Sequence, residues 1–176
     1  MSVTLRAVVE TRESWLTLDG SCGDEEIGQF VAIVADYNKS APGELVAAEH
    51  LIVCGGLILT DGVTEVVPGC CCGLEDWREW VTDVRERRSP WLGHDPTPQL
   101  SFEERTITVW EDIGSPDNKP PFAGPRIELE PAHLASLLRG VHRDLVAFHA
   151  NLARWGGPAL AAHLDAAFSF TAPLEL

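Results

Sequence analysis

The sequence has no apolar run long enough to cross a lipid bilayer. Its longest runs, such as Leu51–Leu59, fall far short of the roughly 20 residues that a membrane-spanning helix requires. The first residues also lack the basic and apolar regions of a secretory signal peptide. We therefore expect a cytoplasmic protein without a membrane partner, in which the five cysteines are reduced.

Basic residues are scarce. The chain has 13 Lys and Arg against 27 Asp and Glu, a net charge of −14. Residues 131–176 carry three of each sign, so the negative charge belongs to the first three quarters of the chain. This balance argues against nucleic-acid binding, which needs a basic face to neutralise phosphate. It is compatible with a basic protein partner, since complementary charge speeds encounter, but the favoured interpretation of the charge is that it only confers solubility.

Common catalytic motifs are also missing. The sequence contains no phosphate loop, dinucleotide fingerprint, nucleophile elbow or zinc-protease helix. It has no internal repeat, and its 176 residues suit one domain spanning residues 1–176. A non-enzymatic function is therefore favoured, although no enzyme class is excluded.

The sequence does contain a mixture of strand and helix patterns. Alternating and β-branched residues predict strands at Leu5–Glu10, Trp15–Asp19, Thr106–Trp110 and Arg126–Glu130. Two apolar runs, Leu51–Thr60 and Val63–Val67, flank the turn-forming pair Asp61-Gly62 and predict a β-hairpin. Loops are predicted at Ser89–Leu100 and Gly114–Pro125, where proline is frequent.

Helical spacing of apolar residues predicts four helices. The first follows Asp24 and carries Ile27, Phe30, Val31, Val34 and Tyr37 on one face, with a strand at Phe30–Val34 as the alternative. A second spans about Leu74–Arg87, a long one starts at Pro131, and a short one starts at Pro158. We therefore predict the α+β class: an antiparallel sheet with helices packed on it, including a long C-terminal helix and a shorter one.

Three adjacent cysteines, Cys70-Cys71-Cys72, lie between the hairpin and the second helix. In an extended segment Cys70 and Cys72 would point to one side and Cys71 to the other. Cys70 and Cys72 could then bind zinc with His94, or with Cys54, as a Cys/His ligand set. Cys72, nearest the helix N-terminus, is the thiol that we expect to be activated. A packed structural corner is the favoured interpretation, because buried free cysteine behaves as a small apolar residue.

The loop after the second helix contains two further candidates. Asp95 could orient the imidazole of His94, which could then act as a base for a thiol such as Cys72. Asp95 is equally suited to a turn before Pro96. Trp91 precedes them in a loop containing Pro and Gly, so we expect it at the surface as a contact for a partner.

The segments Pro68–Trp80 (PGCCCGLEDWREW) and Pro90–Pro96 (PWLGHDP) resemble a family of small acidic proteins from actinobacteria. The similarity extends over most of the chain. The resemblance implies no activity and assigns no catalytic residues.

The sequence thus predicts a non-enzymatic, acidic protein-interaction module, of the kind found among immunity proteins and antitoxins, with a basic protein partner and no cofactor. Tentative binding residues are Trp91, His94, Asp95 and Cys72. The alternatives are a zinc- or thiol-dependent protein that uses Cys70, Cys72 and His94, and a small-ligand binder between the sheet and the proline-containing loops.

Overall fold

The computed structural model describes residues 2–175 and contains two antiparallel sheets. The larger sheet has the order β2-β1-β3-β4, with β1 and β3 at its centre. Its strands are β1 (Thr4–Glu10), β2 (Trp15–Thr17), β3 (Gly55–Thr60) and β4 (Glu65–Val66). The smaller sheet has the order β5-β6-β7, with strands β5 (Gln99–Phe102), β6 (Ile107–Trp110) and β7 (Arg126–Leu129).

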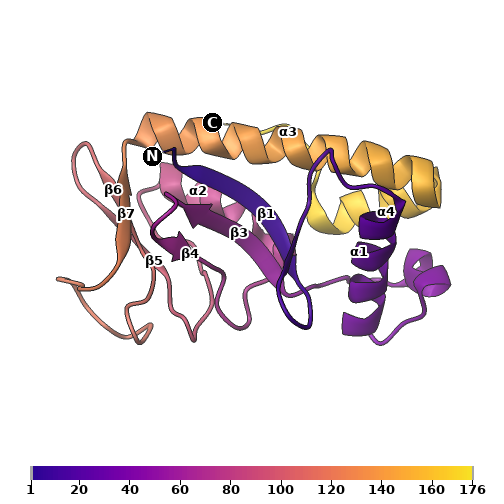
Figure 1. Ribbon diagram of the computed structural model, residues 1–176, viewed down its shortest axis with the longest axis horizontal. Helices are drawn as coiled ribbons and strands as arrows, with labels where there is room; N and C mark the ends of the chain where they lie inside the picture. Colours follow the sequence, from indigo (N-terminus) through magenta and orange to yellow (C-terminus); the bar gives the residue numbers. More distant parts are fainter. Residues whose placement is uncertain (1, 176) are drawn as a thin grey trace.

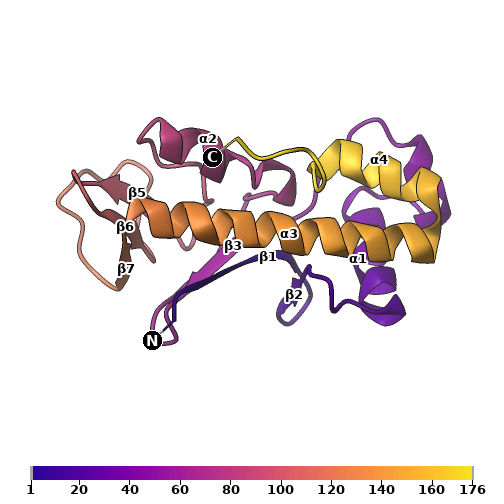
Figure 2. The same cartoon turned by 90° about the horizontal axis from the view of Figure 1, so that it is seen from above.

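The long helix α3 (Pro131–Gly156) connects the two ends of the molecule, from the smaller sheet to α1 (Figure 1). Most of its apolar stripe, including Leu138, Leu145 and Phe148, is fully buried, whereas Trp155 at its end is 41% exposed. After Gly157 the chain reverses, and α4 (Pro158–Phe168) lies beside α3 (Figure 2). The predicted long and short C-terminal helices are therefore confirmed, as is the α+β class.

Helix α1 (Asp24–Tyr37) has the predicted position and most of the predicted buried face. The Gly23 N–H donates to the Glu26 carboxylate, which occupies the first turn and stabilises the start of the helix. The alternative of a strand at Phe30–Val34 is wrong, because burial follows the helical period. Tyr37 departs from the predicted stripe and is 47% exposed.

The predicted helix over Leu74–Arg87 is interrupted. A short 3-10 helix (Leu74–Asp76) precedes α2 (Glu79–Arg85). Tertiary hydrogen bonds hold this first turn in place: the Glu75 carboxylate accepts the Val53 N–H, and the buried Trp77 indole donates to the Phe168 carbonyl. The position of this segment is therefore set by its neighbours more than by its own helical propensity.

The predicted hairpin is present with shorter arms, β3 and β4, and a longer turn. Thr60 pairs with Glu65, so residues 61–64 form the connection instead of Asp61-Gly62 alone. The Asp61 carboxylate accepts the N–H groups of Val63 and Thr64, each at 2.8 Å, and so stabilises the wider turn. Two other elements were not predicted: the 3-10 helix Pro42–Ala47 and strand β5, whose start lies within a predicted loop.

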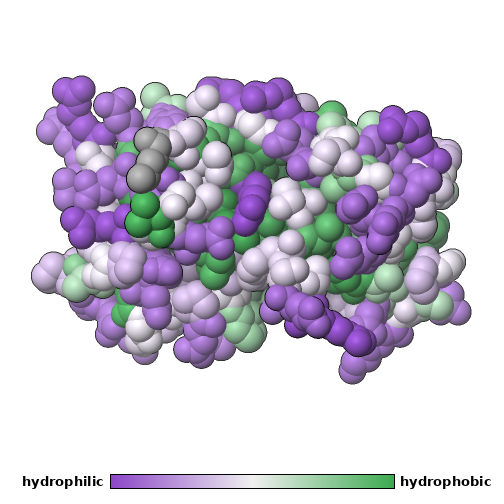
Figure 3. All heavy atoms as spheres, viewed as in Figure 1, coloured by the Kyte–Doolittle hydropathy of each residue, from purple (hydrophilic) through white to green (hydrophobic). Residues whose placement is uncertain are grey.

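A continuous set of buried apolar side chains links both sheets to the helices. Phe30, Phe148, Phe168 and Phe170 form a group of aromatic contacts where α1, α3 and the end of α4 meet. The outer face seen in Figure 3 is mainly hydrophilic, with hydrophobic side chains visible between the polar ones. No helix within residues 2–175 is both long and apolar enough to cross a membrane.

Candidate functional site

The cysteine triplet occupies a tight turn. The Cys72 N–H donates to the Gly69 carbonyl at 3.2 Å, so Cys70 and Cys71 are the two central residues of a four-residue turn. Cys71 has φ of 65°, in the left-handed region that non-glycine residues seldom adopt. The alternating side-chain directions of an extended strand therefore do not apply here.

Backbone hydrogen bonds attach this turn to the loop that carries His94. The Cys70 N–H donates to the His94 carbonyl at 2.6 Å, and the His94 N–H donates back to the Cys70 carbonyl at 3.1 Å. The two backbone segments approach closely because they carry glycines, Gly69 and Gly93, at the point of contact. A β-carbon on Gly69 would lie 2.0 Å from the Pro96 carbonyl oxygen, a distance that no packing tolerates.

The other side of the turn is attached to the segment that leads into β3. The Gly55 N–H donates to the Cys72 carbonyl at 3.1 Å, and the Leu74 N–H donates to the Val53 carbonyl at 3.0 Å. The turn is thus held between two backbone segments that are distant from each other in the sequence. This arrangement fixes the positions of the exposed thiols although they lie in a loop.

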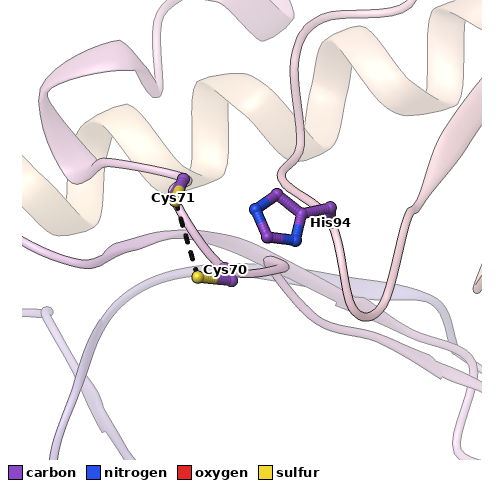
Figure 4. A group of neighbouring side chains, drawn as sticks. All are labelled: Cys70, Cys71 and His94. Atoms are coloured by element: carbon purple, nitrogen blue, oxygen red, sulfur yellow. Dashed lines mark hydrogen bonds between the residues drawn. The ribbon is translucent and has the colours of Figure 1, made fainter. Parts of the chain in front are cut away.

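Three potential ligand atoms converge at this turn, as Figure 4 shows. The Sγ atoms of Cys70 and Cys71 are 3.5 Å apart, and these atoms and a ring nitrogen of His94 all lie within 4.8 Å of one another. Both cysteines are exposed, and His94 is half-buried. The cluster is therefore accessible from solvent.

Of the three predicted metal ligands, Cys70, Cys72 and His94, the structure brings Cys70 and His94 together with Cys71 and not with Cys72. The turn directs the side chain of Cys71 toward Cys70 and His94, whereas Cys72 is buried. Burial raises the pKa of the Cys72 thiol to about 12, and the negative charge of nearby carboxylates such as Asp76 and Glu75 adds to the effect. The expectation that Cys72 is the activated thiol is therefore wrong.

The thiol with the opposite behaviour is Cys71. Hydrogen bonds from the side chains of Cys70 and then His94 lower the pKa of Cys71, because they stabilise its thiolate. The same contact raises the pKa of Cys70. The hydrogen bond to Asp95, followed by that to Cys71, raises the pKa of His94.

Two other predicted residues, Asp95 and Trp91, lie beside the cluster. The Asp95 carboxylate oxygen is 3.1 Å from His94 Nδ1 and favours a proton on that nitrogen. Trp91 is 47% exposed, and its indole N–H donates to the Cys71 carbonyl at 3.3 Å. The sequence thus identified most of this site but not Cys71. The Pro68-Gly69 turn signal before the triplet could have indicated it.

A groove of 580 Å³ begins at the two exposed thiols. Cys70 and Cys71 line one part of it, together with Cys54, and residues of α1 such as Ile33 and Tyr37 line another. Burial, and next the hydrogen bond to Glu10, raise the pKa of Cys54 to about 12. Cys54 is therefore protonated at neutral pH, whereas the pKa of Cys71 is shifted in the opposite direction.

We expect the two exposed thiols of the metal-free protein to differ in reactivity. The pKa of Cys71 is lowered and that of Cys70 is raised. As the pH is increased, alkylation of Cys71 by iodoacetamide should therefore accelerate at a lower pH than alkylation of Cys70. Mass spectrometry of peptides from a series of pH values measures both rates. Replacing His94 by Asn should move the Cys71 profile to higher pH. Identical profiles for the two cysteines would contradict this electrostatic description.

Comparison with protein-family models, curated proteins and solved structures finds no match for the chain.

Proposed function

We propose that the protein binds a transition metal ion, of which zinc fits best, through Cys70, Cys71 and His94. The observation that carries this proposal is the convergence of their three ligand atoms within 4.8 Å. In a tetrahedral zinc site with Zn–S bonds of about 2.3 Å, two sulfur atoms are about 3.8 Å apart. The present separation of 3.5 Å requires little adjustment.

The surroundings of the three side chains support the same proposal. Metal-binding histidines typically donate their second ring N–H to a carboxylate, and Asp95 lies in this position beside His94. Two thiolates would also balance the charge of a divalent ion. The left-handed conformation of Cys71 costs about 1–2 kcal/mol that glycine would avoid, so the presence of a thiol there favours a functional role.

Zinc titration of the metal-free protein against a chromogenic chelator tests the proposal. We expect one zinc per chain, and a loss of at least about 100-fold in affinity when Cys70, Cys71 or His94 is replaced by Ala. Cys72→Ala is the matched control, because it removes a neighbouring thiol that lies outside the cluster. Absence of stoichiometric zinc, or equal losses for Cys71→Ala and Cys72→Ala, would refute the proposal.

A second candidate function, an acidic interaction module of the immunity or antitoxin kind, is supported by a different observation. The chain has a net charge of −14, and the large side chain of Trp91 is 47% exposed beside the cluster. A basic protein partner would suit both features. Pull-down from a host lysate should then recover a specific basic protein at low salt, and much less of it at high salt or with Trp91→Ala. Failure to recover such a partner would leave this function without support.

A further inference from the structure

The groove beside the cysteines has the size and composition of a small-molecule site. Its volume of 580 Å³ lies within the range of about 300–1,000 Å³ typical of ligand pockets. Apolar surface dominates its lining, which includes Ile33, Tyr37 and Val53. Ile33 is partly buried against the core and Tyr37 is 47% exposed.

The groove and the proposed metal site share two residues. Cys70 and Cys71 belong to the ligand cluster and also line the groove. The cluster supplies three protein ligands, and a tetrahedral zinc ion with three protein ligands keeps its fourth position for water or a substrate. A molecule in the groove would therefore be close enough to occupy that position.

The charges that line the groove restrict what such a molecule can be. The open fourth position of a bound metal would accept one anionic donor atom, and Arg12 adds a cation to the lining. Glu10 and Asp36 also line the groove and disfavour a further anionic group on the ligand. A single anionic group at the metal, attached to an apolar body, satisfies these conditions.

We propose that this groove binds a small molecule that has an anionic, metal-coordinating head, such as a thiolate or carboxylate, and an apolar body. The inference rests on the proposed metal-binding function. The head takes the fourth position on the ion held by Cys70, Cys71 and His94. The apolar body packs against the exposed side of α1, at Ile33 and Tyr37.

Cobalt substitution tests this inference and the metal site separately. Cobalt bound by thiolates has visible absorption bands that respond to a change in the fourth ligand. The cobalt protein is titrated with phenylethanethiol and with mercaptoethanol, which has a similar thiol head but no phenyl ring. We expect phenylethanethiol to change the spectrum and to bind about tenfold tighter or more, because its ring is buried in the groove.

A pair of variants tests whether the groove is the cause of the tighter binding of phenylethanethiol. Ala32 is exposed and lines the groove, so Ala32→Arg places a long side chain in it without disturbing the core. This variant should keep the cobalt spectrum and lose the preference for phenylethanethiol. Ala132→Arg, at an exposed position of α3 that is not part of the groove lining, should keep both.

The outcomes separate the two proposals. If cobalt binds but the two thiols bind equally well, or Ala32→Arg keeps the preference, the groove inference is overturned and the metal site stands. If cobalt does not bind at the cysteines, the metal proposal fails, and this inference fails with it.

Discussion

Replacing Cys71 by glycine is expected to abolish metal binding while leaving the protein as stable as before. Cys71 has φ of 65°, which a side chain makes unfavourable by about 1–2 kcal/mol and glycine adopts freely. The greater flexibility of glycine in the unfolded state offsets part of this gain. The free energy of unfolding should therefore be unchanged or increased by up to about 1 kcal/mol. Zinc affinity should fall at least about 100-fold, because one of three ligands is lost.

This prediction separates a functional cysteine from a structural one. Chemical denaturation of the metal-free protein gives the stability, and chelator competition gives the zinc affinity. Cys71→Ala is the matched control, since it removes the same thiol but keeps a β-carbon in the strained conformation. If Cys71→Gly lost more than about 1 kcal/mol of stability, packing at the turn would be the main role of this residue.

Replacing Gly69 by alanine is expected to destroy the site although all three ligands remain. The added β-carbon would lie 2.0 Å from the Pro96 carbonyl oxygen and 2.6 Å from the His94 backbone nitrogen. Both are backbone atoms, so the clash is relieved only if the backbone segments that contain Gly69 and His94 move apart. The reciprocal hydrogen bonds between Cys70 and His94 would then break. We expect a loss of about 3 kcal/mol or more in unfolding free energy, and loss of stoichiometric zinc.

Gly43→Ala is the control for this substitution. A β-carbon at Gly43 meets no atom within 4 Å, and its backbone conformation does not require glycine. This variant should keep both stability and zinc binding. If Gly69→Ala bound zinc with wild-type affinity, the backbone pairing of the two segments would not be what positions the ligands.

The helices could be predicted from the sequence because their signal is local. Apolar residues at helical spacing in α3, from Leu134 to Leu152, are all on the buried side, and Gly157 ends the helix where the pattern stops. The α2 region was predicted less well, since its first turn depends on Val53 and Phe168, which are far away in the sequence. Tertiary hydrogen bonds of this kind leave no periodic signal.

The site was predicted in part for a similar reason. Cys70 and His94 were identified by residue type, and the structure places them side by side. The choice between Cys71 and Cys72 depended on side-chain direction, which the turn at Gly69–Cys72 reverses from that of a strand. The pairing of Cys70 with His94 depends on two glycines that permit close approach. Neither feature follows from the spacing of the cysteines.

The most direct test of the metal-site proposal is X-ray absorption spectroscopy at the zinc edge of the zinc-loaded protein. The proposal predicts two sulfur neighbours at about 2.3 Å and one imidazole nitrogen at about 2.0–2.1 Å. In Cys71→Ala one sulfur neighbour should disappear, and in Cys72→Ala both should remain. A first shell made only of oxygen and nitrogen, or one that loses sulfur in Cys72→Ala, would contradict the proposed site at Cys70, Cys71 and His94.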